Sequence, residues 1–347
     1  MAPVITRELL RTLPKAELHC HLDGSVRAST LLELAREYGK PMPASDADAL
    51  AEYMVVRGAS SLEEYLERFS VTLSVMQHAE ALERIAYELM EDAARDGVRY
   101  LEMRYAPVLN QREGLSLGEA VEAPVRAIER AANDFGVRGG VIICALRTMP
   151  PDVSLELARL AVSYRGRGVV GFDLAGGEKG HPAAAHADAF AYARRHDLAV
   201  TVHAGEGDGA ASVRDAVHAC CANRIGHATR LVEDESLARY VNDRRIALEI
   251  CLTSNVQTRA ASAYETHPLR TYYDRGMNVV LNTDNRLMSG TTLTDEYLHA
   301  ASSLGFTFNE LCEIALNGFA NAFLPWEERA LMLDEARADM EALTGRS

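Results

Sequence analysis

Eight short apolar runs rich in β-branched residues recur along this 347-residue chain, with helical periodicity between them. Strands that alternate with helices in this way form a parallel sheet, because each crossover helix returns the chain to the same end of the sheet. Eight such units are enough to close the sheet on itself. The pattern therefore predicts a (β/α)8 barrel of the TIM type. The runs are 16–22, 98–107, 141–148, 168–176, 198–206, 223–229, 246–255 and 277–285.

The connection after the first run is too long for one helix. It extends from Gly24 to about Asp96 and contains the loop KPMPASDADA and a second helical stretch, SLEEYLERFSVTLSVMQ. An insertion there belongs on the catalytic face, where it can form a lid. The stretch WEERALMLDEARADMEAL predicts a last amphipathic helix. No repeat, low-complexity segment or linker divides the sequence, so we expect residues 1–347 to form one domain.

Charge and composition exclude several classes of protein. The formal net charge is −14, which disfavours binding to nucleic acid or to an anionic membrane, since both need a basic face. No apolar run approaches the roughly 20 residues that span a bilayer, and the N-terminal stretch lacks the apolar core of a signal peptide. The six cysteines are scattered without a CxxC pair. We therefore expect a cytoplasmic protein with reduced thiols, and no feature indicates an oligomeric state.

Two histidines stand two positions apart in the first run. His19 and His21 share one face of the expected strand, because side chains alternate along a strand, and this face points into the barrel. Two imidazoles on one side of a strand are suited to a metal ion, although an HxH pair is weak evidence by itself.

Further reactive side chains stand at or just beyond the ends of later runs. We expect His203 and His227 to end the fifth and sixth strands, with Glu206 just beyond His203 in the loop, and Asp284 to end the eighth strand. Barrel enzymes build their active sites at these carboxyl-terminal strand ends. Three neutral imidazoles and one carboxylate suit zinc better than magnesium or calcium, and the spacing leaves open which histidine is not a ligand. We expect surface or structural positions for the other histidines: His78, His181, His186, His196, His218, His267 and His299.

Six motifs carry a family resemblance. PKAELHCHLDGS, DLAGGE, TVHAGE, RIGHAT, LTSN and LNTD, in this order and at these strand ends, resemble the adenosine deaminase family of the amidohydrolase superfamily. The likeness extends from Pro14 through the NAFLP segment near Asn321. It implies one zinc ion per chain, with water as a further ligand, and the protein ligands are His19, His21, His203 and Asp284.

The resemblance also implies roles in catalysis. Glu206 is expected to give a proton to purine N1, and His227 to orient the attacking water, either as a base or as a cation. Zinc lowers the pKa of bound water to about 7, and Asp284 can take a proton from that water. Burial can raise the pKa of a carboxyl group such as Glu206 toward neutrality, as a proton donor requires.

The substrate-facing residues implied by the resemblance are His21, Asp23, Gly176 and Asn285. Gly176 would present its backbone N–H to purine N3, and Asp23 would lie near a ribose hydroxyl. A lid is expected from the second helical stretch, although ordinary helix packing explains the same apolar residues: Leu62, Tyr65, Leu66 and Phe69.

Two positions depart from the commonest family pattern. Asn285 stands where many members have a second aspartate, and an amide can donate to purine N7 without being protonated first. The alternative is that Asn285 only shapes the turn before Arg286. Gly177 stands where aspartate is common, and nothing in the sequence says what this changes.

The sequence thus predicts a zinc hydrolase that deaminates adenosine and 2′-deoxyadenosine to inosine products and ammonia in purine metabolism. Asp23 would repel a 5′-phosphate, which favours a nucleoside over AMP. The nearest alternatives are deaminases of another 6-aminopurine, such as adenine or aminodeoxyfutalosine. More remote are a metallo-hydrolase of esters or amides and a silent nucleoside-binding protein. The fourth run lacks the lysine of binuclear relatives, and the combination of HxE with PCxxC that marks the cytidine-type deaminases does not occur.

Overall fold

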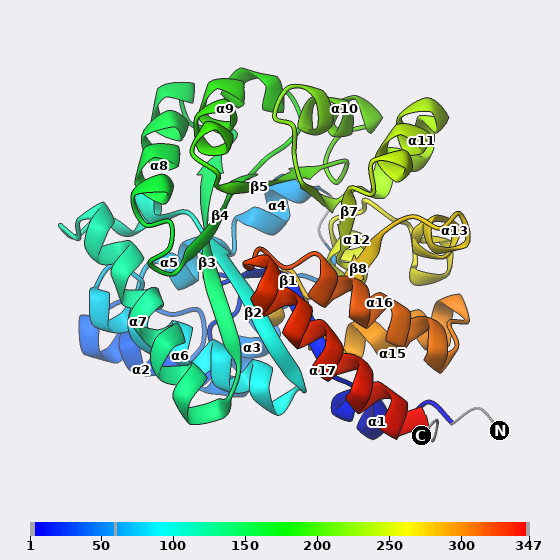
Figure 1. Cartoon of the computed structure of the whole chain (residues 1–347). Coiled ribbons are helices and arrows are strands. Elements are labelled where there is room, and N and C mark those ends of the chain that lie inside the picture. Colours follow the sequence, from blue (N-terminus) through cyan, green and yellow to red (C-terminus); the bar gives the residue numbers. More distant parts are fainter. Residues whose placement is uncertain (1–3, 59–60, 345–347) are drawn as a thin grey trace.

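Eight parallel strands form a nearly closed barrel in the computed structural model, which describes residues 4–58 and 61–344. Each strand pairs with the next in sequence order, and helices surround the barrel, which confirms the predicted (β/α)8 fold (Figure 1). The strands are β1 (Lys15–His21), β2 (Val98–Tyr105), β3 (Arg138–Leu146), β4 (Val169–Ala175), β5 (Ala199–Ala204), β6 (Arg224–His227), β7 (Ala247–Ile250) and β8 (Val279–Leu281).

Closure between the last strand and the first depends on the segment after β8. The backbone of Asp284 exchanges hydrogen bonds with β1: the N–H of His21 donates to the carbonyl of Asp284 at 2.7 Å, and the N–H of Asp284 donates to the carbonyl of His19 at 3.0 Å. The side chain of Asn282 accepts from two successive β1 amides at 2.8 and 3.1 Å. This side chain replaces the regular ladder, so β8 is shorter than the predicted run 277–285.

The outer helices cover the barrel, since their apolar faces need the apolar outer surface of the strands. Helix α7 (Leu117–Phe135) begins with a capping box made by Ser116 and Glu119 and ends at Gly136, whose φ of +71° suits glycine. The other covering helices are α6 (Ala79–Arg95), α8 (Pro151–Ser163), α9 (Ala187–Arg195), α10 (Ala210–His218), α11 (Glu235–Asp243), α13 (Leu269–Asp274), α15 (Leu293–Leu304) and α16 (Phe308–Ala320).

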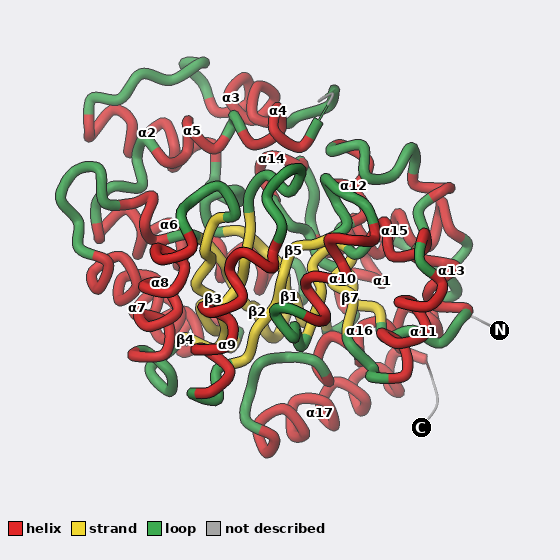
Figure 2. The backbone as a smooth tube through the Cα atoms, turned by 90° about the horizontal axis from the view of Figure 1, so that it is seen from above, coloured by secondary structure: helices red, strands yellow, loops and turns green. Residues whose placement is uncertain are grey.

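The long connection after β1 folds as helices at one end of the barrel, as the sequence predicts. They are α2 (Ala28–Tyr38), α3 (Ala47–Met54), α4 (Leu62–Leu66) and α5 (Phe69–Leu73). The final helix α17 (Trp326–Thr344) lies at the opposite end and packs against α16 (Figure 2). The remaining helices are α1 (Arg7–Thr12), α12 (Leu252–Gln257) and α14 (Arg286–Ser289), with short 3-10 turns at 107–110, 183–186, 229–233 and 264–266.

Several predicted runs include the loop that follows their strand. The run 246–255 is strand only to Ile250, and its last four residues begin α12, where the N–H of Asn255 donates to the carbonyl of Cys251 at 2.9 Å. Within the described residues no helix is both long and apolar enough to cross a membrane.

Candidate active site

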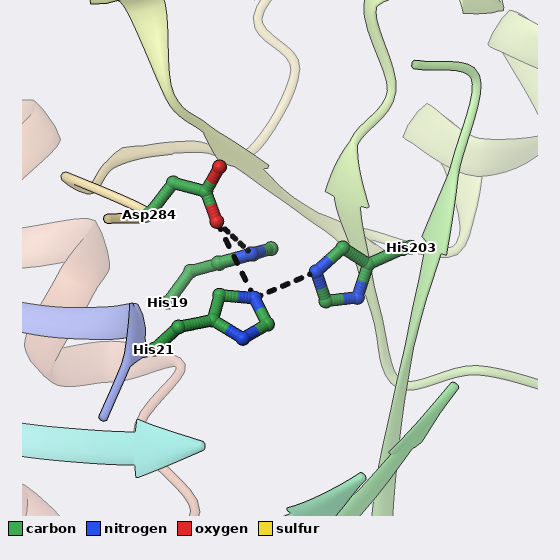
Figure 3. A group of neighbouring side chains, drawn as sticks. All are labelled: His19, His21, His203 and Asp284. Atoms are coloured by element: carbon green, nitrogen blue, oxygen red, sulfur yellow. Dashed lines mark hydrogen bonds and ion pairs between the residues drawn. The ribbon is translucent and has the colours of Figure 1, made fainter. Parts of the chain in front are cut away.

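Three histidines and one aspartate converge inside the barrel near the ends of the strands (Figure 3). Each offers one ligand atom, and these atoms lie within 4.8 Å of one another; the residues are His19, His21, His203 and Asp284. The first two come from β1 and point to the same side because they are two residues apart. Asp284 does not end β8 itself, as the sequence suggested, but stands three residues beyond Leu281.

The arrangement of these four side chains suits a cation, and we call it the cation site. The Nε2 atoms of His21 and His203 face each other at 3.0 Å, and Oδ1 of Asp284 lies 3.3 Å from Nε2 of both His19 and His21. Two imidazole nitrogens at this distance need a positive charge or a proton between them, since neutral lone pairs repel. The donor set of imidazole nitrogens and carboxylate oxygen suits zinc.

The charge states fit the same conclusion. Burial holds the pKa of His21 well below its usual range and also lowers the pKa of His203, so both are neutral and able to bind a metal. Burial opposes ionisation of Asp284, but the hydrogen bond with His19 and the nearby imidazoles hold its pKa well below the ordinary value. For His19, burial and Arg104 lower the pKa, yet the hydrogen bonds with acidic partners outweigh them and raise it. The site therefore attracts positive charge.

Two buried carboxylates orient the histidines from behind. Nδ1 of His19 lies 2.9 Å from Glu249 on β7, and Nδ1 of His203 lies 3.0 Å from Asp173 on β4. Arg104 on β2 bridges both carboxylates, at 3.1 Å from Asp173 and 3.0 Å from Glu249. These contacts occupy the Nδ1 atoms and leave the Nε2 atoms for a metal, which is the usual arrangement behind metal-binding histidines.

A second pair of side chains stands beside the cation site. Glu206 lies in the loop after β5 and His227 ends β6, and Oε2 of Glu206 is 3.4 Å from Nε2 of His227. These two side chains and Asp284 again have ligand-type atoms within 4.8 Å of one another. Burial holds the pKa of His227 well below its usual range, so the imidazole is neutral.

The tautomer of His227 follows from a chain of hydrogen bonds that starts at a backbone amide. The N–H of Leu269 donates to Nδ1 of His267 at 3.1 Å, so His267 carries its proton on Nε2 and donates to Oδ1 of Asn255 at 3.0 Å. The Asn255 amide then donates from Nδ2 to Nδ1 of His227 at 2.9 Å. The neutral His227 consequently carries its proton on Nε2, facing Glu206.

A cavity of about 420 Å³ opens above these groups. It has the size usual for a small-molecule site. Every predicted site residue lines it except His19, which lies fully buried beneath: the lining includes His21, Asp23, Leu62, Tyr65, Leu66, Phe69, Gly176, His203, Glu206, His227, Asp284 and Asn285.

The predicted substrate-facing residues differ in their surroundings. Asp23 is buried, burial raises its pKa to about 7, and its Oδ1 has no hydrogen-bond partner within the described chain. Oδ1 of Asn285 is likewise buried without a partner there. Asn285 precedes α14 but its side chain makes no capping bond, which disfavours the view that it only shapes the turn. Gly176 has a φ of +93°, a left-handed conformation that suits glycine.

The predicted lid residues belong to α4 and α5. Leu62 and Tyr65 are buried against the cavity, and the hydroxyl of Tyr65 lies 3.1 Å from Oγ of Ser289 at the end of α14. The ring centroid of Phe69 is 6.4 Å from that of His21. The insertion thus forms one wall of the cavity.

Sequence reasoning missed the residues behind the site. Ser254 donates to Oδ2 of Asp284 at 2.6 Å, and Glu178 accepts backbone N–H groups from the loop that carries Glu206. The signal available was a single charged residue inside an apolar strand run. This signal marks Asp173 and Glu249, whereas the run of Arg104 also contains Arg99 and Glu102. His267, expected at a surface or structural position, is buried and belongs to the chain of hydrogen bonds that ends at His227.

Solved structures similar to this one are deaminases and related hydrolases. An adenine deaminase from Arthrobacter aurescens has a TM-score of 0.88 at 26% identity and covers 94% of this chain and 99% of its own. An amidohydrolase from Burkholderia ambifaria, solved with bound Zn, has a TM-score of 0.87 at 27% identity, covering 99% and 96%. The N6-methyl-AMP deaminase from Arabidopsis thaliana has a TM-score of 0.83 at 29% identity, covering 95% and 99%.

Relatives in sequence are more similar still. Adenosine deaminase 1 from Streptomyces coelicolor is 43% identical over 344 residues, which cover 94% of this chain and 86% of that protein. A probable adenosine deaminase from Dictyostelium discoideum is 42% identical over 92% of this chain, which spans 42% of that protein's length. The family model for adenosine deaminase matches residues 14–338. With the fold, the motifs and these relatives in agreement, the chain belongs to the adenosine deaminase family.

Proposed function

We propose that this protein hydrolyses adenosine and 2′-deoxyadenosine to inosine and 2′-deoxyinosine with release of ammonia, using one zinc ion per chain. Its family membership identifies it as a hydrolytic deaminase. The observation that carries the proposal is the convergence of four metal-ligand atoms within 4.8 Å beside a carboxyl group and a neutral imidazole. The expected zinc ligands are His19, His21, His203 and Asp284.

A zinc ion in this site would lower the pKa of a water molecule and supply hydroxide near neutral pH. His227, with its proton on Nε2, orients the attacking oxygen by donating a hydrogen bond. Asp284 accepts a proton from the water, and Ser254 orients the carboxylate by donating to its Oδ2 at 2.6 Å. Of the two charge states that the sequence left open for His227, the neutral one is supported by its burial and by the bond from Asn255.

Glu206 acts in its protonated form as the general acid. Attack at C6 breaks the aromaticity of the purine, and a proton given to N1 lets the ring accept the electrons. The proton held by Asp284 then passes to the C6 amine, which leaves as ammonia, and the C6 hydroxyl returns a proton to Glu206 as the ring becomes the 6-oxo product. General acid catalysis of this kind typically contributes about 100- to 10,000-fold to the rate.

Purine recognition is assigned to the cavity wall. The backbone N–H of Gly176 meets N3, and the amide of Asn285 donates to N7, which is an acceptor. Asp23 accepts from, or when protonated donates to, a ribose hydroxyl. The apolar side chains of α4 and α5 exclude water from the bound base, which strengthens these polar contacts.

Adenine and purine nucleotides are the competing substrates. Similar structures include an adenine deaminase and an N6-methyl-AMP deaminase. Asp23 argues against a 5′-phosphate, but the argument weakens near neutral pH because burial raises its pKa to about 7. The preference for nucleosides is therefore expected to sharpen as the pH rises and Asp23 ionises.

A substrate panel tests the proposal. The zinc-loaded protein is incubated with adenosine, 2′-deoxyadenosine, adenine, AMP and a 5′-extended adenosine, and ultraviolet absorbance and ammonia are followed. We expect the two nucleosides to be turned over fastest. Turnover of only adenine, AMP or the extended nucleoside would keep the chemistry and change the substrate. No turnover of any of these compounds would exclude a deaminase acting on them and would favour a binding protein or another hydrolase.

Glu206→Gln tests the mechanism separately. The variant should bind zinc in the wild-type stoichiometry but lose at least about 100-fold in kcat, because its amide cannot give the proton. The exposed Glu156→Gln is the matched control and should behave as wild type. Normal turnover by Glu206→Gln would mean that another group protonates N1.

A further inference from the structure

We propose that Glu178 is a positioning residue that holds the loop of Glu206 in its reactive place, with Arg147 securing the other end of the same segment. Neither residue was assigned a role by the motifs. This inference rests on the proposed function for its kinetic readout, but the contacts that carry it stand by themselves.

Glu178 accepts four successive backbone N–H groups from the loop after β5. Its Oε1 accepts from Gly205 at 2.6 Å, and its Oε2 accepts from Glu206 at 2.9 Å, Gly207 at 2.6 Å and Asp208 at 3.1 Å. The carboxylate is buried. Successive N–H groups that converge on one point form a concavity for an anion, and bonds from N–H groups to a charged acceptor are stronger than neutral ones.

Arg147 binds the other end of the same segment, with a positive charge in place of a negative one. It follows β3, and its guanidinium donates to the backbone carbonyl of His203 and, at 2.8 Å, to that of His181. A cation therefore binds a carbonyl at the start of the segment and an anion binds the amides at its end. Each charge matches the backbone dipole that it meets. Burial lowers the pKa of Arg147, and the nearby Glu178 carboxylate partly offsets this effect.

The loop needs such partners because no regular element satisfies its amides. β5 ends at Ala204 and α10 begins at Ala210, so residues 205–208 lie between the two. Gly205 adopts a φ of +77°, and a Cβ there would meet the side chain of Val213 at 2.7 Å. The N–H groups of Gly205 and Glu206 are buried, and unpaired buried amides are costly, so without Glu178 the loop would move to find other partners.

The place of Glu206 depends directly on this backbone. Its own N–H and those on both sides are bound to Glu178, while its side chain lines the cavity and lies 3.4 Å from His227. Glu178 also follows Gly176 by two residues, and Gly176 lines the same cavity. One carboxylate thus fixes the distance between the group proposed to protonate N1 and the group proposed to meet N3.

Glu178→Ala is the main test, made on the full-length zinc-loaded protein. Displacement of a catalytic group by about 1 Å costs on the order of 100-fold, so we expect kcat for adenosine to fall about 100-fold. Zinc content should stay at the wild-type value, because Glu178 contacts none of the four proposed ligands. The variant keeps the four N–H groups but leaves space for a small carboxylate.

Chemical rescue separates positioning from general structural damage. Formate or acetate should bind the vacated N–H groups and restore kcat in a saturable manner, whereas chloride at equal ionic strength should not. Glu206→Gln, which leaves the Glu178 carboxylate in place, should show no rescue, and Glu156→Gln should need none. A fall in kcat with no rescue by either anion, or a kcat within twofold of wild type, would overturn the proposal.

Two further measurements keep the test decisive. Glu178→Gln is the test variant if Glu178→Ala does not fold. It retains the shape of the side chain but turns an NH2 group toward the backbone donors, so it should lose activity, and formate should not restore it. Hydrogen exchange at residues 205–208 requires no turnover: exchange should be faster in Glu178→Ala and slow again in formate. If the wild type deaminates none of the panel, the proposed function fails, and exchange still decides the role of Glu178. Unchanged exchange would contradict it.

Discussion

His19 and Glu249 share a hydrogen bond in the interior of the barrel, with Nδ1 of the imidazole 2.9 Å from Oε2 of the carboxylate. Burial alone would favour the protonated acid, but Arg104 and Arg224 hold the pKa of Glu249 far below its usual range. An ionised Glu249 therefore accepts a hydrogen bond from Nδ1 of His19, which leaves Nε2 facing the other proposed metal ligands. The site is thus oriented by charges on the strands behind it.

Removing these charges should weaken zinc binding. In Glu249→Gln and Asp173→Asn the amides no longer orient His19 and His203 as strongly, and zinc affinity should fall about 10- to 100-fold, the usual effect of losing such partners. Competition with a chromogenic chelator measures the affinity. Glu83→Gln, whose ion pairs with Arg126 and Arg130 are exposed, is the control. Wild-type affinity in both buried variants would show that the histidines orient themselves.

The chain behind His227 leads to a second prediction. Asn255→Asp replaces the donating amide with an acceptor, so Nδ1 of His227 becomes protonated and Nε2 loses its proton or the ring becomes a cation. We expect kcat to fall at least about 100-fold, since a catalytic histidine in the wrong tautomer is severely impaired. Nitrogen-15 NMR of the imidazole reports the tautomer directly. An active variant whose His227 keeps the wild-type tautomer would remove Asn255 from this role.

The proposed metal ligands and the residues behind His227 show what a sequence can and cannot predict. His19 and His21 could be assigned to one face because two-residue spacing on a strand fixes their direction. Asp284 could be assigned to the same rim because parallel strands end together. Asn255 and His267 could not, because their roles depend on the fold of α12 and the loop after it, where no periodicity applies. Glu178 was equally hidden, since its four partners come from another loop.

Asn285 gives a third prediction, on substrate recognition. If its amide donates to N7, then 7-deazaadenosine, which lacks this acceptor, should have a kcat/KM at least about 10-fold below that of adenosine, the effect of leaving a buried donor unpaired. Asn285→Ala should reduce kcat/KM for adenosine to the value for 7-deazaadenosine, so that the variant no longer distinguishes the two nucleosides. Asn285→Asp can donate only when protonated, so its kcat/KM should decline toward higher pH relative to wild type. If wild type and Asn285→Ala discriminate equally between adenosine and 7-deazaadenosine, a group other than Asn285 binds N7.

Glu296 leads to a prediction about stability. This residue of α15 is fully buried and accepts from the N–H of Thr253 at 3.1 Å and the hydroxyl of Thr291 at 2.8 Å. Burial is the main cause that raises its pKa from 4.5 to about 7, despite these hydrogen bonds. Between these two pH values the folded protein holds a proton that the unfolded chain has released.

The free energy of unfolding should therefore decrease as the pH rises from about 5 to about 7, because the unfolded chain binds fewer protons there, and it should level off above the folded pKa. The contribution of Glu296 approaches about 1.4 kcal/mol per pH unit inside this window, or about 2–3 kcal/mol in total. Glu296→Gln stays neutral and can accept from Thr253, so its stability should decline less over the same window. Urea unfolding of both zinc-loaded proteins at pH 5 and pH 7.5 measures the difference. Parallel declines in the two proteins would mean that Glu296 is ionised in the fold across this range, with a cationic or polar group compensating its burial.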